Sequence, residues 1–479
     1  MEKKNKGLTV PHLTMMALGS VIGSSFFLGS SLAISAAGPS ILISYILAGA
    51  LIYLILFALS ELTVADPSAG SFSTFATRNL GPGVGFVVGW LYWTGTVLGM
   101  SSEATAITIL VQKFYPGVAI SWFGSAIIIG VTLLNLLGVE KIGKLTSGLS
   151  SIKLLTIVLF ILGALTLIFG LLPGRAAIGV GELANQPLMP GGITSIAGSM
   201  LLVVFAYAGF EVIALASAEV RDPQRTIPRA IRYTVITLVG LYVLYAIVLL
   251  PLIPTASLNE NISPMVASLS RWGIGWAGTA INVVLITASL STMMASIFAV
   301  GRMIRSLVEE EHGPKWLKDK TDVPYRGILF SGGAMLLGLG FGLLFPRVYL
   351  VLITTSGFTL LFTYAVIMAS HIRFRKTQGC PPTGDCQMPG HPYTSWIALI
   401  SLVVILLSMP LIKGQGTGLI TGLAATAAYS LLYLAIRSRR RARAEAPLKR
   451  VAQPLQYRTS LLTEYSRELG EEEEKDPEK

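Results

Sequence analysis

The sequence predicts an all-α polytopic membrane protein with twelve transmembrane helices: a five-plus-five inverted repeat followed by two additional helices. Three observations support this fold class. Hydrophobic residues make up 53% of the 479 residues and charged residues only 13%, whereas about a quarter of the residues in soluble domains are charged. Apolar runs recur at the ~20 residues that a helix needs to cross a bilayer. Glycines interrupt two of these runs at matching positions, the first and the sixth.

The twelve predicted spans follow one another along most of the chain. They lie near 10–36, 40–62, 84–110, 119–138, 146–172, 194–218, 230–253, 275–304, 327–345, 348–370, 394–412 and 416–436. Residues 1–437 form the membrane domain, with repeat 1 at about 10–172, repeat 2 at about 194–370, and helices 11 and 12 at about 394–436. The tail, 438–479, has few apolar residues and blocks of like charge, so we expect it to be disordered. Its basic start favours contact with anionic lipid headgroups.

The distribution of basic residues predicts the orientation. With the N-terminus in the cytoplasm, thirty of the 36 Lys and Arg lie on the cytoplasmic side. One lies inside a span, and five lie outside: Lys113, Arg175, Arg271, Arg347 and Lys413. This bias follows the positive-inside rule and places both termini in the cytoplasm. We therefore interpret the net charge of +11 as a consequence of membrane topology and not as a sign of nucleic-acid binding.

The interrupted spans suggest a binding site. The first contains "GSVIGSSFF" (19–27), and the sixth contains Gly209 and Glu211 in "VVFAYAGFEVIALASAEV". Because the sixth span is five spans on from the first and five is odd, the two segments enter the membrane from opposite sides, as an inverted repeat requires. Broken helices are tolerated at the midplane where they line a cavity, and their free N–H and C=O groups attract anions and cations. An α-amino acid carries one of each charge. The alternative is that these small residues serve helix packing.

Five segments together resemble the amino acid-polyamine-organocation superfamily of transporters, and within it the bacterial amino acid permeases. The resemblance extends over almost the full length. It is carried by "LTMMALGSVIGSSFFLGSSLAISAAGPS", "ALSELTVADPSAGSFSTFATRNLGPGVGFVVGWLYW", "SSIKLLTIVLFI", "FAYAGFEVIALASAEVRDPQRTIPRAI" and "ITASLSTMMASIFAVGRMIRSL".

The resemblance implies a substrate site at the broken first and sixth helices. The substrate carboxylate would be held by backbone N–H groups of Gly23, Ser24 and Ser25. The ammonium group would be held by carbonyls of Val21, Phe205 and Ala208, with the Phe205 ring as a gate. The sequence departs from the family pattern at Ser25, where a glycine is usual, so the backbone there is more crowded.

Charged residues inside spans are candidates for coupling transport to an ion. Lys153 is the only Lys or Arg well inside a span. The resemblance implies that its ammonium substitutes for a sodium ion and reaches the Gly19 carbonyl and the Ser291 hydroxyl. Burial disfavours the charged form of lysine, so a proton can leave and return during transport. The alternative is that Lys153 stays protonated throughout and serves as a structural contact between helices.

Glu103 and Glu211 are candidate proton-relay residues. Either carboxylate can instead be tied to backbone at a helix break. The neighbouring glycine favours the tied interpretation for Glu211, and both interpretations stay open for Glu103.

We therefore expect a secondary transporter that imports an amino acid with a proton across the plasma membrane of a prokaryote. No further acidic residue near the breaks would suit a cationic substrate, which favours a neutral, apolar amino acid. Exchange of one amino acid for another is the alternative, and a non-transporting amino acid receptor is less favoured.

Other classes of function lack sequence support. The four histidines form no catalytic set, so we expect no enzyme. No nucleotide-binding loop or cofactor motif is present. Cys380, Cys386 and His391 do not match a zinc pattern, so we interpret their segment as a loop with reduced thiols and expect no metal.

Overall fold

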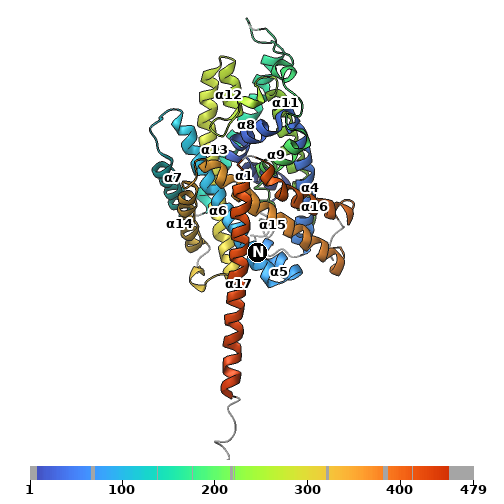
Figure 1. The fold of residues 1–479 in the computed structure, drawn as a ribbon, viewed down its shortest axis with the longest axis vertical. Coiled ribbons are helices and arrows are strands. Elements are labelled where there is room, and N and C mark those ends of the chain that lie inside the picture. The colour runs from blue at the N-terminus through green and yellow to red at the C-terminus, as the bar shows by residue number, and fades with distance from the viewer. Residues whose placement is uncertain are drawn as a thin grey trace, which may run out of the picture. The chain divides into compact units, whose positions relative to one another are not determined.

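The computed structural model describes residues 8–65, 71–137, 139–174, 176–215, 220, 222–319, 323–380, 387–412 and 414–451. These residues form the helices drawn in Figure 1. They also form one isolated β-bridge, between Leu8 and Val220. The chain separates into two compact units, Met1–Tyr429 and Ser430–Lys479. The first unit contains both interrupted segments. Because helices make up almost all of the regular secondary structure of the described residues, the predicted all-α membrane fold is confirmed for them.

The first half of the chain contains helices of very different lengths. They are α1 (Val10–Val21), α2 (Ser24–Phe27), α3 (Gly29–Ala37), α4 (Ile41–Ala65), α5 (Ser71–Leu80), α6 (Pro82–Gln112), α7 (Ile120–Asn135) and α8 (Val139–Ile168). A 3₁₀ turn at Gly38–Ser40 separates α3 from α4. Proline occupies the first position of α6, where its missing N–H has no partner to lose.

The second half contains a second interrupted segment and several long helices. They are α9 (Gly192–Ala206), α10 (Val212–Leu215), α11 (Pro223–Leu249), α12 (Pro264–Arg271), α13 (Gly275–Glu309), α14 (Tyr325–Gly342), α15 (Val348–Gln378), α16 (Tyr393–Ser408) and α17 (Gly416–Val451). Helix α15 ends at Gln378 and is followed by Gly379, which has a φ of 75°. Helix α17 continues past residue 437, where the predicted tail begins.

Eight helical segments in the described residues are long and apolar enough to cross a membrane. The difference from twelve has local causes. Helices α1 and α9, with 12 and 15 residues, are fragments of the interrupted spans, and α7 has only 16 residues. Helix α14, which corresponds to the predicted span 327–345, has 18 residues and is also not among the eight. The segment from Ser24 to Ala65 joins the rest of the first predicted span to the second. The number twelve stays a prediction.

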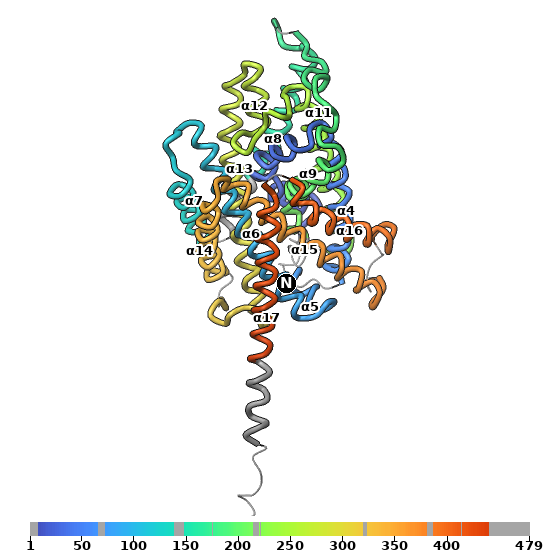
Figure 2. Tube along the Cα trace, in the orientation of Figure 1, coloured from blue at the N-terminus to red at the C-terminus, as the bar shows by residue number. Residues whose placement is uncertain are grey.

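Packing brings the two interrupted segments together in the middle of the first unit. Helix α6 packs against α13 and α15, while α3 and α4 pack against α9, and α1 packs against α10. Figure 2 shows the blue N-terminal helices beside the green α9. Residues 186 positions apart, such as Gly23 and Gly209, thus belong to one region of the fold.

The structure corrects the expectation of reduced thiols. Cys380 is disulfide-bonded, and Cys386 lies outside the described residues. The expectation came from the predicted compartment alone, and a compartment does not determine the state of an individual thiol.

Candidate functional site

The first interruption is a two-residue extended segment. Helix α1 ends at Val21, Ile22 has φ −81° and ψ 97°, Gly23 has φ −131° and ψ −159°, and α2 begins at Ser24. This extended backbone cannot continue the α-helical hydrogen-bond ladder. The break therefore exposes carbonyls on its α1 side and N–H groups on its α2 side.

The second interruption depends on Gly209. Its φ of 109° lies outside the range that side chains favour, and a Cβ there would lie 2.8 Å from the carbonyl oxygen of Ser20. The hydroxyl of Ser20 donates a hydrogen bond to the Gly209 carbonyl at 2.7 Å. The two interruptions are therefore in direct contact, and only glycine allows their backbones to approach this closely.

Lys153 binds the α1 side of the first break. Its side chain is 1% exposed, and its Nζ donates to the carbonyls of Gly19 at 2.9 Å and Ile22 at 3.0 Å. The third bond goes to Thr292 Oγ1 on α13 at 3.0 Å. An ammonium group has three donors, so these contacts use all of them. Gly19 brings α8 close to α1, because a Cβ there would collide with the Ser150 side chain.

Glu103 binds the α2 side of the same break. The Ser24 N–H donates to both carboxylate oxygens of Glu103, at 2.9 and 3.0 Å. The carbonyl of Ser24 accepts the Tyr349 hydroxyl at 3.1 Å. A Cβ on Gly23 would lie 2.6 Å from Glu103 Oε1, so glycine at this position lets the carboxylate reach the backbone.

Glu211 is tied to its own interruption. Its Oε2 accepts the Gly209 N–H at 2.7 Å, and its Oε1 accepts the Tyr364 hydroxyl. Glu211 is buried, with 3% of its surface exposed. Each break thus has one buried carboxylate bound to one of its backbone N–H groups.

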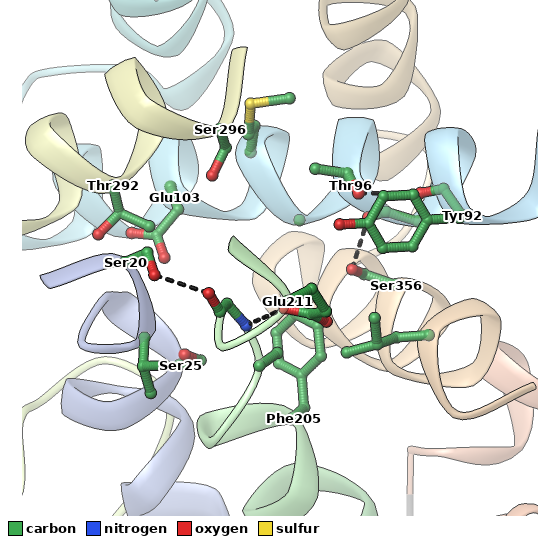
Figure 3. A pocket seen from close by; sticks show the side chains of 17 residues that line it. Ser20, Ser25, Tyr92, Thr96, Glu103, Phe205, Glu211, Thr292, Ser296 and Ser356 are labelled. Carbon is green, nitrogen blue, oxygen red and sulfur yellow. Dashed lines mark hydrogen bonds between the residues drawn. The ribbon is translucent and has the colours of Figure 1, made fainter. Parts of the chain in front are cut away.

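A cavity of about 120 Å³ lies between the two interruptions, α6, α13 and α15 (Figure 3). Six of the sequence-predicted residues line it: Val21, Ser25, Phe205, Ala208, Glu103 and Glu211. Ser24 and Gly23 lie behind Glu103, and Lys153 with Gly19 lies on the other side of the break. The Phe205 carbonyl accepts the Tyr207 N–H and, at 3.0 Å, the Ala208 N–H, so a ligand ammonium group would have to share or displace these contacts.

The structure does not bring Ser291 to Lys153. The Ser291 hydroxyl donates to the Ala288 carbonyl of its own helix at 2.9 Å, and Thr292 takes the place expected for it. One residue of helix changes the direction of a side chain by about 100°. Two adjacent hydroxyl residues cannot be assigned to a face unless the orientation of α13 is known.

Sequence reasoning also missed pocket residues from long helices, including Tyr92, Thr96, Ser296 and Ser356. Their only sequence signal is that polar residues recur inside apolar spans. That signal is weak, because Ser and Thr in a helix can satisfy their hydroxyls by bonding to the preceding turn, as Thr96 does with the Tyr92 carbonyl at 2.9 Å.

The interrupted helices around a buried cavity define the class of protein as a polytopic transporter. Comparisons with known proteins identify the family. The amino acid permease family model matches residues 12–438. An uncharacterized amino acid permease, YtnA, from Bacillus subtilis (strain 168) is 33% identical over 416 residues, which cover 85% of this chain and 90% of that protein.

Two further relatives from Bacillus subtilis (strain 168) carry substrate names. The gamma-aminobutyric acid permease is 32% identical over 430 residues, covering 87% of this chain and 92% of that protein. The probable threonine/serine transporter YbxG is 31% identical over 415 residues, covering 84% and 89%.

The chain belongs to the amino acid permease family, in the amino acid-polyamine-organocation superfamily. The predicted family is confirmed. The protein is therefore a membrane transporter of amino acids.

Proposed function

We propose that the protein imports a neutral, apolar amino acid together with a proton across the plasma membrane, with both termini in the cytoplasm. The observation that carries the proposal is the contact of two interrupted helices at one buried cavity. The N–H groups of Gly23–Ser25 would hold the substrate carboxylate, and the carbonyls of Val21, Phe205 and Ala208 its ammonium group.

The carboxylates in the cavity support a neutral side chain. Both Glu103 and Glu211 are bound to backbone N–H groups, so neither is arranged to pair with a cationic substrate side chain. The substrate names of the relatives differ from one another and do not decide the side chain.

Lys153 is the group that we propose to link protonation to conformation. As an ammonium it joins α1, α8 and α13 through three hydrogen bonds. A neutral amine has lost its charge–dipole attraction to the carbonyls and would release them. This linkage does not require a sodium site.

Exchange of amino acids is a second candidate function. It is favoured by the complete use of the three Lys153 donors, because a fixed ammonium would act as a structural pin and leave no titration to drive uptake.

Uptake by the purified protein in liposomes tests both candidates. The competitors are unlabelled amino acids supplied one at a time, with and without an imposed pH gradient. Proton symport predicts accumulation driven by the gradient alone. Uptake that needs internal amino acid and ignores the gradient would establish exchange.

A further inference from the structure

We propose that Glu103 and the substrate carboxylate compete for the same backbone N–H, that of Ser24, and that binding of the substrate is linked to uptake of one proton by Glu103. The proposal rests on the proposed function, since it assumes that an amino acid binds at the first break. It adds the reason why binding and protonation depend on each other.

The Ser24 N–H cannot bind the ionised carboxylates of Glu103 and of the substrate at the same time. Glu103 presents both oxygens to the Ser24 N–H, at 2.9 and 3.0 Å. Its Oε1 also fills the space in front of Gly23, where a Cβ would lie 2.6 Å away. A second carboxylate can reach this N–H only if Glu103 moves or shares the position.

The side chain of Glu103 faces the cavity, where a substrate would meet it. Figure 3 shows its carboxylate beside Thr292, and Ser25 at the wall of the same pocket. The hydroxyls of Ser24 and Ser289 lie near the carboxylate, yet make no hydrogen bond of normal geometry within the described residues. Displacement of Glu103 therefore breaks its two contacts with the Ser24 N–H and its weaker interactions with the Ser24 and Ser289 hydroxyls.

The charges around Glu103 determine what happens when a second carboxylate arrives. The titratable groups that face it are Lys153 on α8, Tyr349 on α15, and Glu211 and Tyr92 across the cavity. Lys153 is the one cation among them. Two ionised carboxylates in contact at a buried site are strongly unfavourable, and one of them takes up a proton.

The proposed step transfers one proton to Glu103. One proton from the aqueous solution bonds to a carboxylate oxygen of Glu103, and no other covalent bond forms or breaks. The neutral acid then donates its O–H to the substrate carboxylate, which also accepts the Ser24 N–H. One proton enters the site with each amino acid, as symport requires.

Glu211 provides a matched comparison within the same cavity. Its carboxylate binds Gly209, two residues away in its own segment, and the Tyr364 hydroxyl. Glu211 thus caps its own break, whereas Glu103 reaches across from α6 to α2. We assign the substrate-linked proton to Glu103 and not to Glu211.

The test measures binding to the full-length protein in detergent between pH 5 and 7, using a uniformly ¹⁴C-labelled mixture of L-amino acids. The α-carboxylate and α-ammonium groups of amino acids keep their charge in this range, and histidine is left out of the mixture because its imidazole titrates within it. Glu103→Gln mimics the neutral acid, and Glu211→Gln is the matched control. A second measurement follows proton uptake by the wild-type protein in weakly buffered solution with a pH-indicator dye.

We expect wild-type affinity to fall with rising pH, by up to about tenfold per pH unit, which is the limit for one linked proton. Glu103→Gln should bind independently of pH, and about tenfold more tightly than wild type at pH 7, because a neutral amide competes less well than a carboxylate. Glu211→Gln should keep the wild-type pH dependence whatever its affinity. The wild-type protein should take up one proton per amino acid bound.

Two results would overturn the inference. One is a Glu103→Gln variant that binds more weakly than wild type at pH 7 or keeps the wild-type pH dependence. The other is amino acid binding by the wild-type protein without proton uptake. This result would refute the link between binding and protonation even if the Glu103→Gln variant did not fold. A wild-type protein that binds none of the mixture would instead refute the proposed site, and the inference with it.

Discussion

Lys153 and Glu103 bind opposite sides of one helix break. The Nζ of Lys153 lies 2.9 Å from the Gly19 carbonyl and 3.0 Å from the Ile22 carbonyl, and the Glu103 carboxylate accepts the Ser24 N–H at 2.9 Å. The protein thus places an ammonium on the carbonyl side and a carboxylate on the N–H side. A bound amino acid carries the same two charges, so both ends of the break can respond to substrate and to protons.

Replacement of Lys153 by alanine should separate binding from coupling. The variant lacks the ammonium but keeps the cavity residues, so amino acid binding should survive while accumulation driven by a pH gradient is lost. The carbonyls of Gly19 and Ile22 lose a partner, which lowers the free energy of unfolding by roughly 1–3 kcal/mol. Liposome uptake in the absence of sodium provides the measurement. A variant that still concentrates substrate would show that Lys153 is only a structural contact between helices, and would leave Glu103 as the group that carries the coupled proton.

Adjacent hydroxyl residues on α13 should differ in their effects. Thr292→Val removes the side-chain acceptor of Lys153 and leaves one ammonium donor unpaired, so we expect transport to fall by about tenfold, as for the loss of one buried hydrogen bond. Ser291→Ala removes a hydroxyl whose hydrogen bond, among the described residues, goes to Ala288 of its own helix, and should transport at close to the wild-type rate. Initial uptake rates decide between them, and the reverse order would contradict the observed face of α13.

Gly23→Val should abolish amino acid binding. A Cβ at this position would lie 2.6 Å from Glu103 Oε1 and 3.2 Å from Thr292 Oγ1, so a branched side chain would displace both groups and block the approach to the backbone. Gly130→Val on α7 is the control, because a Cβ there meets no atom within 4 Å. Near-normal affinity in the Gly23 variant would place the substrate elsewhere.

Both charged groups of the substrate should be recognised. A methyl ester of the transported amino acid and its decarboxylated amine should each compete about 5- to 150-fold less well, because each leaves a buried partner unpaired, at about 1–3 kcal/mol. Inhibition of uptake in liposomes measures this, with the unmodified amino acid as the reference. Strong competition by the amine alone would indicate a site for polyamines.

Acid should loosen α5 through Glu310, which accepts hydrogen bonds from Ser73 at 2.8 Å and from Thr74. Burial raises the pKa of Glu310, but hydrogen bonds from His312, Thr74 and Ser73 outweigh burial and leave the pKa below its ordinary value. A lowered pKa means that the stabilisation is complete above the ordinary value of about 4.3 and is lost as the pH falls through the folded-state pKa.

Hydrogen exchange of α5, corrected for intrinsic rates, should therefore show reduced protection below about pH 4. Glu310→Gln should have weaker protection at neutral pH and little further change with acid. The same acid dependence in wild type and variant would exclude Glu310 as its cause.

The sequence by itself determined the all-α membrane fold, the two interruptions and the family. These features follow from local chemistry: apolar runs form spanning helices, and glycines such as Gly23 and Gly209 mark where the helical ladder stops. The same reasoning located Lys153, which is buried in the structure, because it stands out against an apolar span.

Only the tertiary structure decided which groups meet. Thr292 rather than Ser291 faces Lys153, because that depends on the rotation of α13 against α1 and α8, and both residues fit the same apolar pattern. The contact of Glu103 with Ser24 is likewise hidden in the sequence, where 79 positions separate them. Helix packing selects one face of each helix from several that are nearly equal in polarity, so partners across a cavity are fixed by the packed bundle and not by spacing along the chain.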